Sequence, residues 1–127
     1  MLVYQPEQPI DAATLQDLGD PAGLGGTVLA GAPRISIRID YQRDTITAGI
    51  FEATTGTVRI VFPFTEHATI LEGQVTITDA DGQRHTYGPG DSYFIEQGAV
   101  VLWEVTAPRV RKSFFNIVNP AAETATG

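Results

Sequence analysis

The sequence predicts a single-domain, all-β antiparallel fold, arranged as a sandwich or a barrel. Strand-like runs recur from Arg34 onward at roughly the 8–12-residue spacing that is typical of such folds. Turn-forming residues separate the runs, as in Asp79-Ala-Asp-Gly82, which joins two short segments and predicts a hairpin. The chain has 127 residues, which is enough for one hydrophobic core and indicates one domain.

The first 33 residues have a different character. They are rich in Pro, Gly and Ala and show little strand pattern, so we expect residues 1–33 to form an irregular N-terminal arm. Within the arm, Asp11–Leu18 is compatible with one short helix that begins at Asp11 and stops at Gly19, and residues 23–31 are expected to be a flexible connection. The tail, residues 120–127, lacks apolar anchors and is expected to fray. This division leaves residues 34–119 for the β domain.

The expected strands cover residues 34–40, 46–53, 57–62, 66–72, 74–79, 84–87, 92–96, 100–105 and 110–118. Alternation orients the last two of them. Trp103 shares a face with Val101 and Val105. Lys112 shares a face with Phe114 and Asn116, which would turn the lysine toward the interior. The opposite face of the last strand is also mixed, so alternation alone leaves both orientations open.

Composition excludes several classes of protein. The formal net charge is -7 and the pI is near 4.6, which argues against nucleic acid and anionic membranes as partners, because both repel an acidic surface. There is no cysteine, hence no disulfide framework and no thiolate metal site. The first residues lack the basic and apolar regions of a signal peptide, and no apolar run approaches the length of a membrane span. We therefore expect a soluble cytoplasmic protein.

Two spaced motifs lie within the β region. Glu66 is followed by six residues and then Gly73, which fits the second half of the pattern G-x5-H-x-H-x3-4-E-x6-G. Gly90, Glu96 and Gly98 fit the spacing of the pattern G-x5-P-x-G-x2-H-x3-N, with Glu96 in place of proline. In their order and spacing, these residues resemble the two motifs of the cupin superfamily.

A closer likeness is to the cupin subgroup that includes the ethanolamine-utilisation cupin and small relatives of ureidoglycine aminohydrolase. The resemblance covers roughly residues 31–118 and implies a single-domain cupin antiparallel β-barrel, or jelly roll, over residues 34–119. The segments that support it are Gly49-Ile-Phe-Glu52, Ile70-Leu-Glu-Gly73, Asp81-Gly82, Gly90-Asp91, Trp103-Glu104 and Arg111-Lys112.

The departures from the family motifs concern metal binding. The histidines of the first motif would fall at Ile60 and Phe62, or at Arg59 and Val61 with the longer spacer, and the histidine of the second motif would fall at Val101. Of the usual ligands, only the glutamate at position 66 remains. A transition-metal site needs three or four converging ligands, so we expect neither a metal nor another cofactor.

Glu66 and Lys112 are the candidate catalytic residues. A carboxyl group that points into an apolar barrel is costly to bury unless it is paired, and such a group is suited to general acid–base chemistry. Lys112 is its natural partner, and a buried lysine can bind an anion or react with a carbonyl group. The alternatives are a rim carboxylate paired with an arginine, a purely structural ion pair, and a solvated edge-strand lysine.

Four further residues are candidate ligand contacts. Tyr93 and Trp103 lie on neighbouring strands and could wall a pocket, although a tryptophan more often fills a core. Phe62 and Arg59 occupy the vacated histidine positions, where a ring could line the pocket and a guanidinium could bind a carboxylate. A core position for Phe62 and a surface position for Arg59 are the simpler interpretations.

These observations favour a metal-independent cupin that binds a small polar or anionic metabolite in the barrel mouth, with an enzyme of small-molecule catabolism as one form of it. The alternatives are a non-catalytic binding or sensing module and a structural dimer whose barrel is filled. We also expect a homodimer, because the apolar content exceeds what one small core needs and open edges of the sheet require cover.

Overall fold

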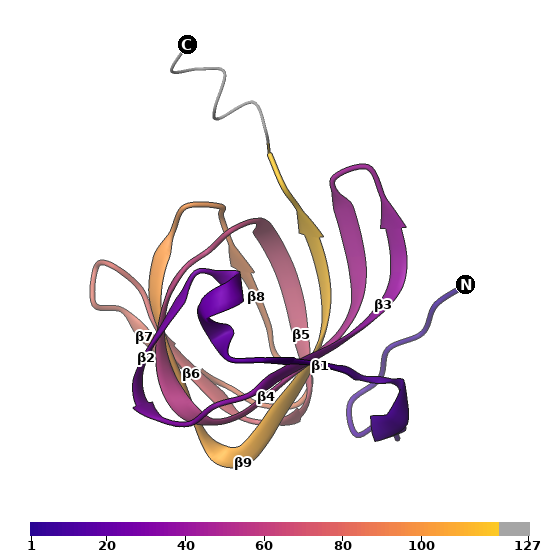
Figure 1. Ribbon diagram of the computed structural model, residues 1–127, viewed down its shortest axis with the longest axis horizontal. Helices are drawn as coiled ribbons and strands as arrows, with labels where there is room; N and C mark the ends of the chain where they lie inside the picture. Colours follow the sequence, from indigo (N-terminus) through magenta and orange to yellow (C-terminus); the bar gives the residue numbers. More distant parts are fainter. Residues whose placement is uncertain (120–127) are drawn as a thin grey trace.

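The computed structural model describes residues 1–119 as an antiparallel β-barrel (Figure 1). The expected fraying of residues 120–127 lies outside the described residues. The strands are β1 (Gln16–Gly19), β2 (Gly26–Gly31), β3 (Ile35–Arg43), β4 (Ile46–Val61), β5 (Thr65–Gly73), β6 (Val75–Thr78), β7 (Arg84–Tyr87), β8 (Ser92–Ile95) and β9 (Val100–Ile117), with short 3-10 helices η1 (Ala12–Thr14) and η2 (Pro21–Leu24). The prediction of a single-domain, all-β antiparallel barrel is confirmed.

Two long strands link the two layers of the barrel. The first part of β4 pairs with β3 and with the end of β9, and the remainder pairs with β2 and with the start of β9. A register shift between Thr54 and Gly56 marks the bend. One layer therefore runs β1-β3-β4-β9-β5-β8 and the other runs β2-β4-β9-β6-β7. Each of β4 and β9 was predicted as two strands, because the middle of each contains polar residues, glycine or proline that are typical of turns.

Gly73 ends β5 at a second bend. Its φ is +78°, and a Cβ atom at this position would lie 2.0 Å from the carbonyl oxygen of Arg109. Only glycine permits both the positive φ and this approach. The bend lets the chain leave β5 in one layer and enter β6 in the other, which explains in physical terms the glycine that closes the first motif.

The prediction of an irregular arm was wrong in two places. Where one helix was expected over Asp11–Leu18, the structure has the single turn η1 followed by β1, and the expected flexible connection over residues 23–31 contains η2 and β2. Both strands have weak propensity of their own, but β1 pairs with β3 and β2 pairs with β4, so they cover backbone groups that would otherwise form open edges. The arm thus pairs with its own barrel.

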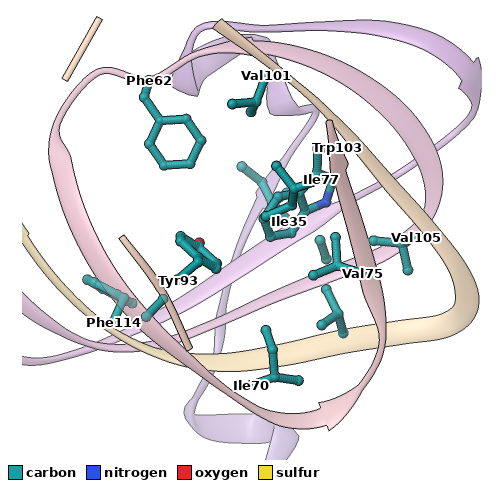
Figure 2. Packing of buried hydrophobic residues seen from close by; sticks show 13 residues of the cluster. Ile35, Phe62, Ile70, Val75, Ile77, Tyr93, Val101, Trp103, Val105 and Phe114 are labelled. Atoms are coloured by element: carbon teal, nitrogen blue, oxygen red, sulfur yellow. The ribbon is translucent and has the colours of Figure 1, made fainter. Parts of the chain in front are cut away.

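The core fills the space between the two layers. Figure 2 shows Phe62, which follows β4, Tyr93 of β8, and Val101 and Trp103 of β9 directed into the interior. Trp103 is buried together with Val101 and Val105, and Lys112 is buried together with Phe114 and Asn116, so the orientation expected for both segments of β9 is present. The expected hairpin is also present, with β6 paired to β7 and Gly82 at φ +85°.

Candidate functional site

Three polar side chains meet inside the barrel. The ammonium of Lys112 donates to Oε2 of Glu66 at 2.8 Å and to the hydroxyl of Tyr93 at 2.5 Å. The Tyr93 hydroxyl in turn donates to Oε2 of Glu66 at 2.6 Å. Glu66 is 2% exposed, and Lys112 and Tyr93 are each 5% exposed, so this is a buried ion pair bridged by a phenol.

The pairing of three strands creates the cluster. β5 lies between β8 and β9, and its inward residues Glu66 and Ala68 lie opposite Asn116 and Phe114 of β9. Ala68 also lies opposite Tyr93 of β8, and its small side chain leaves the space across which Tyr93 and Lys112 reach the carboxylate. His67, the residue after Glu66, is exposed on the outer face, as strand alternation requires.

Aromatic rings surround the ammonium on its other sides. The Nζ atom of Lys112 lies 4.6 Å from the ring centroid of Phe51, 4.8 Å from that of Trp103 and 5.3 Å from that of Tyr93. A ring face attracts a cation, most strongly where water is excluded. The carboxylate and the three rings together surround the ammonium group of the lysine.

Tyr93 is held neutral. Burial, followed by the charge of Glu66 and the hydrogen bond to it, raises the pKa of the Tyr93 phenol well above its usual value. Because its hydroxyl both accepts from Lys112 and donates to Glu66, the phenol can relay a proton between these two groups without itself becoming charged.

The cluster forms part of the wall of an apolar cavity of about 80 Å³ that is partly open to solvent. Glu66, Lys112 and Asn116 supply its polar groups. Its other walls come from η2, β3, β4 and β9 and from the segment between β4 and β5, with Leu24, Ile37, Phe51, Ile60, Phe62, Phe64, Trp103 and Phe114 among them. Part of the N-terminal arm therefore closes one side of the cavity.

A second cavity, of about 270 Å³, lies between the β6–β7 hairpin, β8 and β9. It is larger, but its charged side chains, Asp79, Arg84 and His85, are exposed and lie on the hairpin. The first cavity holds the buried charges, whose cost of desolvation needs an explanation. For that reason we take the first cavity as the candidate site.

The structure brings together most of the residues expected to form the site. Phe62 and Trp103 line the cavity together with the Glu66–Lys112 pair. Tyr93 is hydrogen-bonded to both members of that pair but does not itself line the cavity. Arg59 does not line the cavity, and its side chain is exposed on β4. The alternation of side chains explains this placement, since Val58, Ile60 and Phe62 line the cavity whereas Arg59 and Val61 between them do not.

Asn116 and Phe51 are among the cavity residues that were not predicted as part of the site. Asn116 shares the inward face with Lys112, and Phe51 lies on the inward face of β4, so alternation could have indicated both. The pairing register of the strands, which alternation does not give, shows which residues are neighbours. Phe51 lies directly opposite Lys112, and Asn116 lies directly opposite Glu66.

The residues present do not fit a transition-metal centre. Ile60, Phe62 and Val101 turn apolar side chains inward where the family motifs have histidines, and the ammonium of Lys112 is bound to the remaining carboxylate. Among residues 1–119, no three His, Cys, Asp or Glu side chains gather closely enough to hold a metal ion. A cation would have to displace Lys112 and would then find a single carboxylate.

The antiparallel barrel is the fold expected of a cupin. The family model of the EutQ-like cupin domain matches residues 41–114, and the chain belongs to that family. The search of curated proteins found no match. In the part of the chain that the structure describes, no helix has the length and apolar character required to cross a membrane.

Solved structures show the same fold at low identity. The EutQ protein of Clostridium difficile is 15% identical, with a TM-score of 0.63 over 87% of this chain and 81% of that one. A protein of unknown function from Pseudomonas syringae pv. tomato is 22% identical, with a TM-score of 0.71 over 88% of this chain and 51% of that one. A protein of unknown function from Rhizobium leguminosarum is 17% identical, with a TM-score of 0.60 over 67% of this chain and 82% of that one.

Proposed function

We propose that this cupin binds a small polar metabolite inside its barrel, against Glu66 and Lys112, and that it needs no metal ion to do so. The supporting observation is the cavity itself, an apolar space whose few polar groups converge on one wall. Its volume of about 80 Å³ suits a ligand of few atoms rather than a nucleotide or a sugar chain. A filled barrel would lack this space, which favours binding over the purely structural alternative.

The same geometry would support proton-transfer chemistry. Glu66 can accept a proton from a bound molecule, and Lys112 or the neutral Tyr93 can donate one, all within hydrogen-bond distance of one another. A metal-independent isomerase, lyase or hydrolase is the enzymatic form of the proposal, and a sensor or carrier is its non-catalytic form. Turnover of a bound ligand, abolished in Glu66→Gln with binding retained, separates the two forms.

A thermal-shift screen of small metabolites tests the binding proposal. A ligand that binds only the native state raises the Tm in proportion to its occupancy. Phe62→Trp fills the cavity from its wall, and Phe94→Trp makes the same change on the outer surface, where Phe94 is 68% exposed. Hits should be lost in Phe62→Trp and kept in Phe94→Trp. Hits that survive in both variants, or a screen without hits, would contradict the proposal.

We further propose that the protein is a homodimer, as expected from the sequence. One row of side chains crosses the outer face of the sheet, in which Tyr41, Ala48, Phe115, His67 and Phe94 lie opposite one another on successive strands. Its three aromatic members are exposed, Tyr41 and Phe115 at 46% each. An apolar row of this kind can pack on its own copy about a two-fold axis.

Light scattering at micromolar concentration tests the dimer. Phe94→Lys places a charge in the aromatic row and should give a monomer. Leu29→Lys places the same charge at a 56%-exposed position on β2, away from the row, and should remain dimeric. A wild-type monomer would refute the proposal. The cytoplasmic location remains a prediction from the sequence.

A further inference from the structure

Asn116 is a largely buried residue whose side-chain amide faces the cavity. It is 7% exposed, and its amide makes no hydrogen bond within residues 1–119. No fully buried side-chain nitrogen or oxygen atom in that part of the chain lacks a partner, so the amide of Asn116 is accessible from the cavity. A buried amide that makes no hydrogen bond costs free energy, so such groups are normally satisfied by protein, water or ligand. Asn116 has both a donor and an acceptor to offer to a molecule in the cavity.

The charges of the cavity are already balanced. Lys112 contributes one positive charge and Glu66 one negative charge, and the two are in direct contact. Among residues 1–119, no other charged side chain lines the cavity. An anionic ligand would therefore leave one uncompensated negative charge in an apolar space, which is strongly unfavourable. A neutral ligand keeps the balance.

The polar atoms of the cavity wall that remain available for hydrogen bonds indicate which groups a neutral ligand should carry. Oε1 of Glu66 accepts no hydrogen bond within the described chain, whereas Oε2 accepts two. With the Asn116 amide and the Lys112 ammonium, this wall offers donors and acceptors side by side. The rest of the cavity is lined by apolar and aromatic side chains. The complementary molecule has a short apolar body and one uncharged head that both accepts and donates.

We propose that the ligand is a neutral carbonyl compound of the carboxamide type with a short aliphatic body, and that Asn116 selects it over the corresponding carboxylate. This inference rests on the proposed function, because it assumes that the cavity takes a ligand. It narrows the expected polar or anionic metabolite to an uncharged polar one. The carbonyl oxygen accepts from Lys112 or Asn116, the amide N–H donates to Glu66 or Asn116, and the aliphatic body packs among the rings.

Isobutyramide and isobutyrate test the inference. The two compounds have nearly the same shape. Isobutyramide carries an uncharged NH2 group where isobutyrate carries a carboxylate oxygen. Trp103 is the only tryptophan of the chain and lines the cavity, so its indole N–H signal in NMR titrations at pH 7 reports binding without mutation of the site. Isobutyramide should bind at least about tenfold more tightly than isobutyrate.

Variants of the two asparagines complete the experiment. Asn116→Leu should weaken isobutyramide binding by about fivefold or more, because it removes one hydrogen-bonding partner. Asn119→Leu alters the exposed asparagine just beyond β9 and should leave the affinity unchanged. Unfolding of each variant by urea confirms that both still fold.

The outcomes separate the inference from the proposal on which it rests. If isobutyrate binds as well as isobutyramide, or if Asn116→Leu leaves the affinity unchanged, the inference is wrong and the cavity still binds ligands. If neither compound shifts the Trp103 signal while the metabolite screen yields a cavity ligand of another class, the inference alone is wrong. If no compound of either set enters the cavity, both are wrong.

Discussion

The buried ion pair of Glu66 and Lys112 predicts a strong and asymmetric double-mutant cycle. Lys112→Met removes the charge at nearly constant side-chain length, and Glu66→Gln removes the opposite charge at constant shape. The side chains are 6% and 2% exposed and 2.8 Å apart, so each change leaves an unpaired charge out of contact with bulk water. Such a loss costs about 3–5 kcal/mol of unfolding free energy.

The surroundings of the two charges differ, so the two single variants should lose different amounts of unfolding free energy. In Glu66→Gln the ammonium keeps the Tyr93 hydroxyl and three aromatic rings, which can stabilise a desolvated cation by about 2 kcal/mol. In Lys112→Met the carboxylate keeps only the Tyr93 hydroxyl. Lys112→Met should therefore be the more destabilising change. The double variant leaves no unpaired charge and should cost less than the sum, with a coupling of about 2–3 kcal/mol.

Urea unfolding of the four proteins, followed by circular dichroism, measures the cycle. The pair Arg34–Asp17 is the control: its atoms are equally close at 2.7 Å, but its side chains are 62% and 58% exposed, so its coupling should be far smaller. Additive effects of the Glu66 and Lys112 changes within a few tenths of a kcal/mol would refute the reasoning, as would a coupling no larger than that of the exposed pair.

Two further predictions follow from the same cluster. The raised pKa of Tyr93 means that, above the ordinary phenol value near 10, the unfolded chain has lost a proton that the native state retains, so stability should fall with rising pH by up to about 1.4 kcal/mol per unit. Burial and Asp40 raise the pKa of Tyr4 to about 12, which adds to the same loss of stability at high pH. Tyr93→Phe should therefore reduce the slope of the unfolding free energy against pH between pH 9 and 11 without abolishing it. Equal slopes in the wild type and the variant would show that Tyr93 ionises freely. Elemental analysis of untagged protein should find no stoichiometric transition metal, whereas about one equivalent of Mn, Fe, Ni or Zn that is lost in Glu66→Gln would overturn the proposed metal independence.

Local sequence patterns predicted the barrel strands well where side chains alternate. The buried face of β9 and the hairpin at Gly82 follow from alternation and from turn chemistry, both of which are local. β1 and β2 could not be found in this way, because their residues favour strands weakly and adopt the conformation only by pairing with β3 and β4.

Some residues of the site could be predicted from local sequence patterns, and others could not. The Glu66–Lys112 pair was predictable, because one residue falls at a motif position that points inward and the other shares a face with Phe114. Arg59 lies outside the cavity. The motif allowed two spacings, and only the pattern of burial along β4 distinguishes them. The meaning of Asn116 depends on what it lacks, namely a hydrogen-bonding partner, and an absence of this kind becomes visible only when every neighbour is placed in space.

The most direct test of the account is a crystal structure of the protein with the strongest ligand from the metabolite screen. The account predicts ligand density inside the barrel, with a polar atom within hydrogen-bond distance of Lys112 or Asn116 and the remainder of the molecule against Phe51 and Trp103. Density confined to the second cavity, beside His85, or to the outer face of the sheet would contradict it.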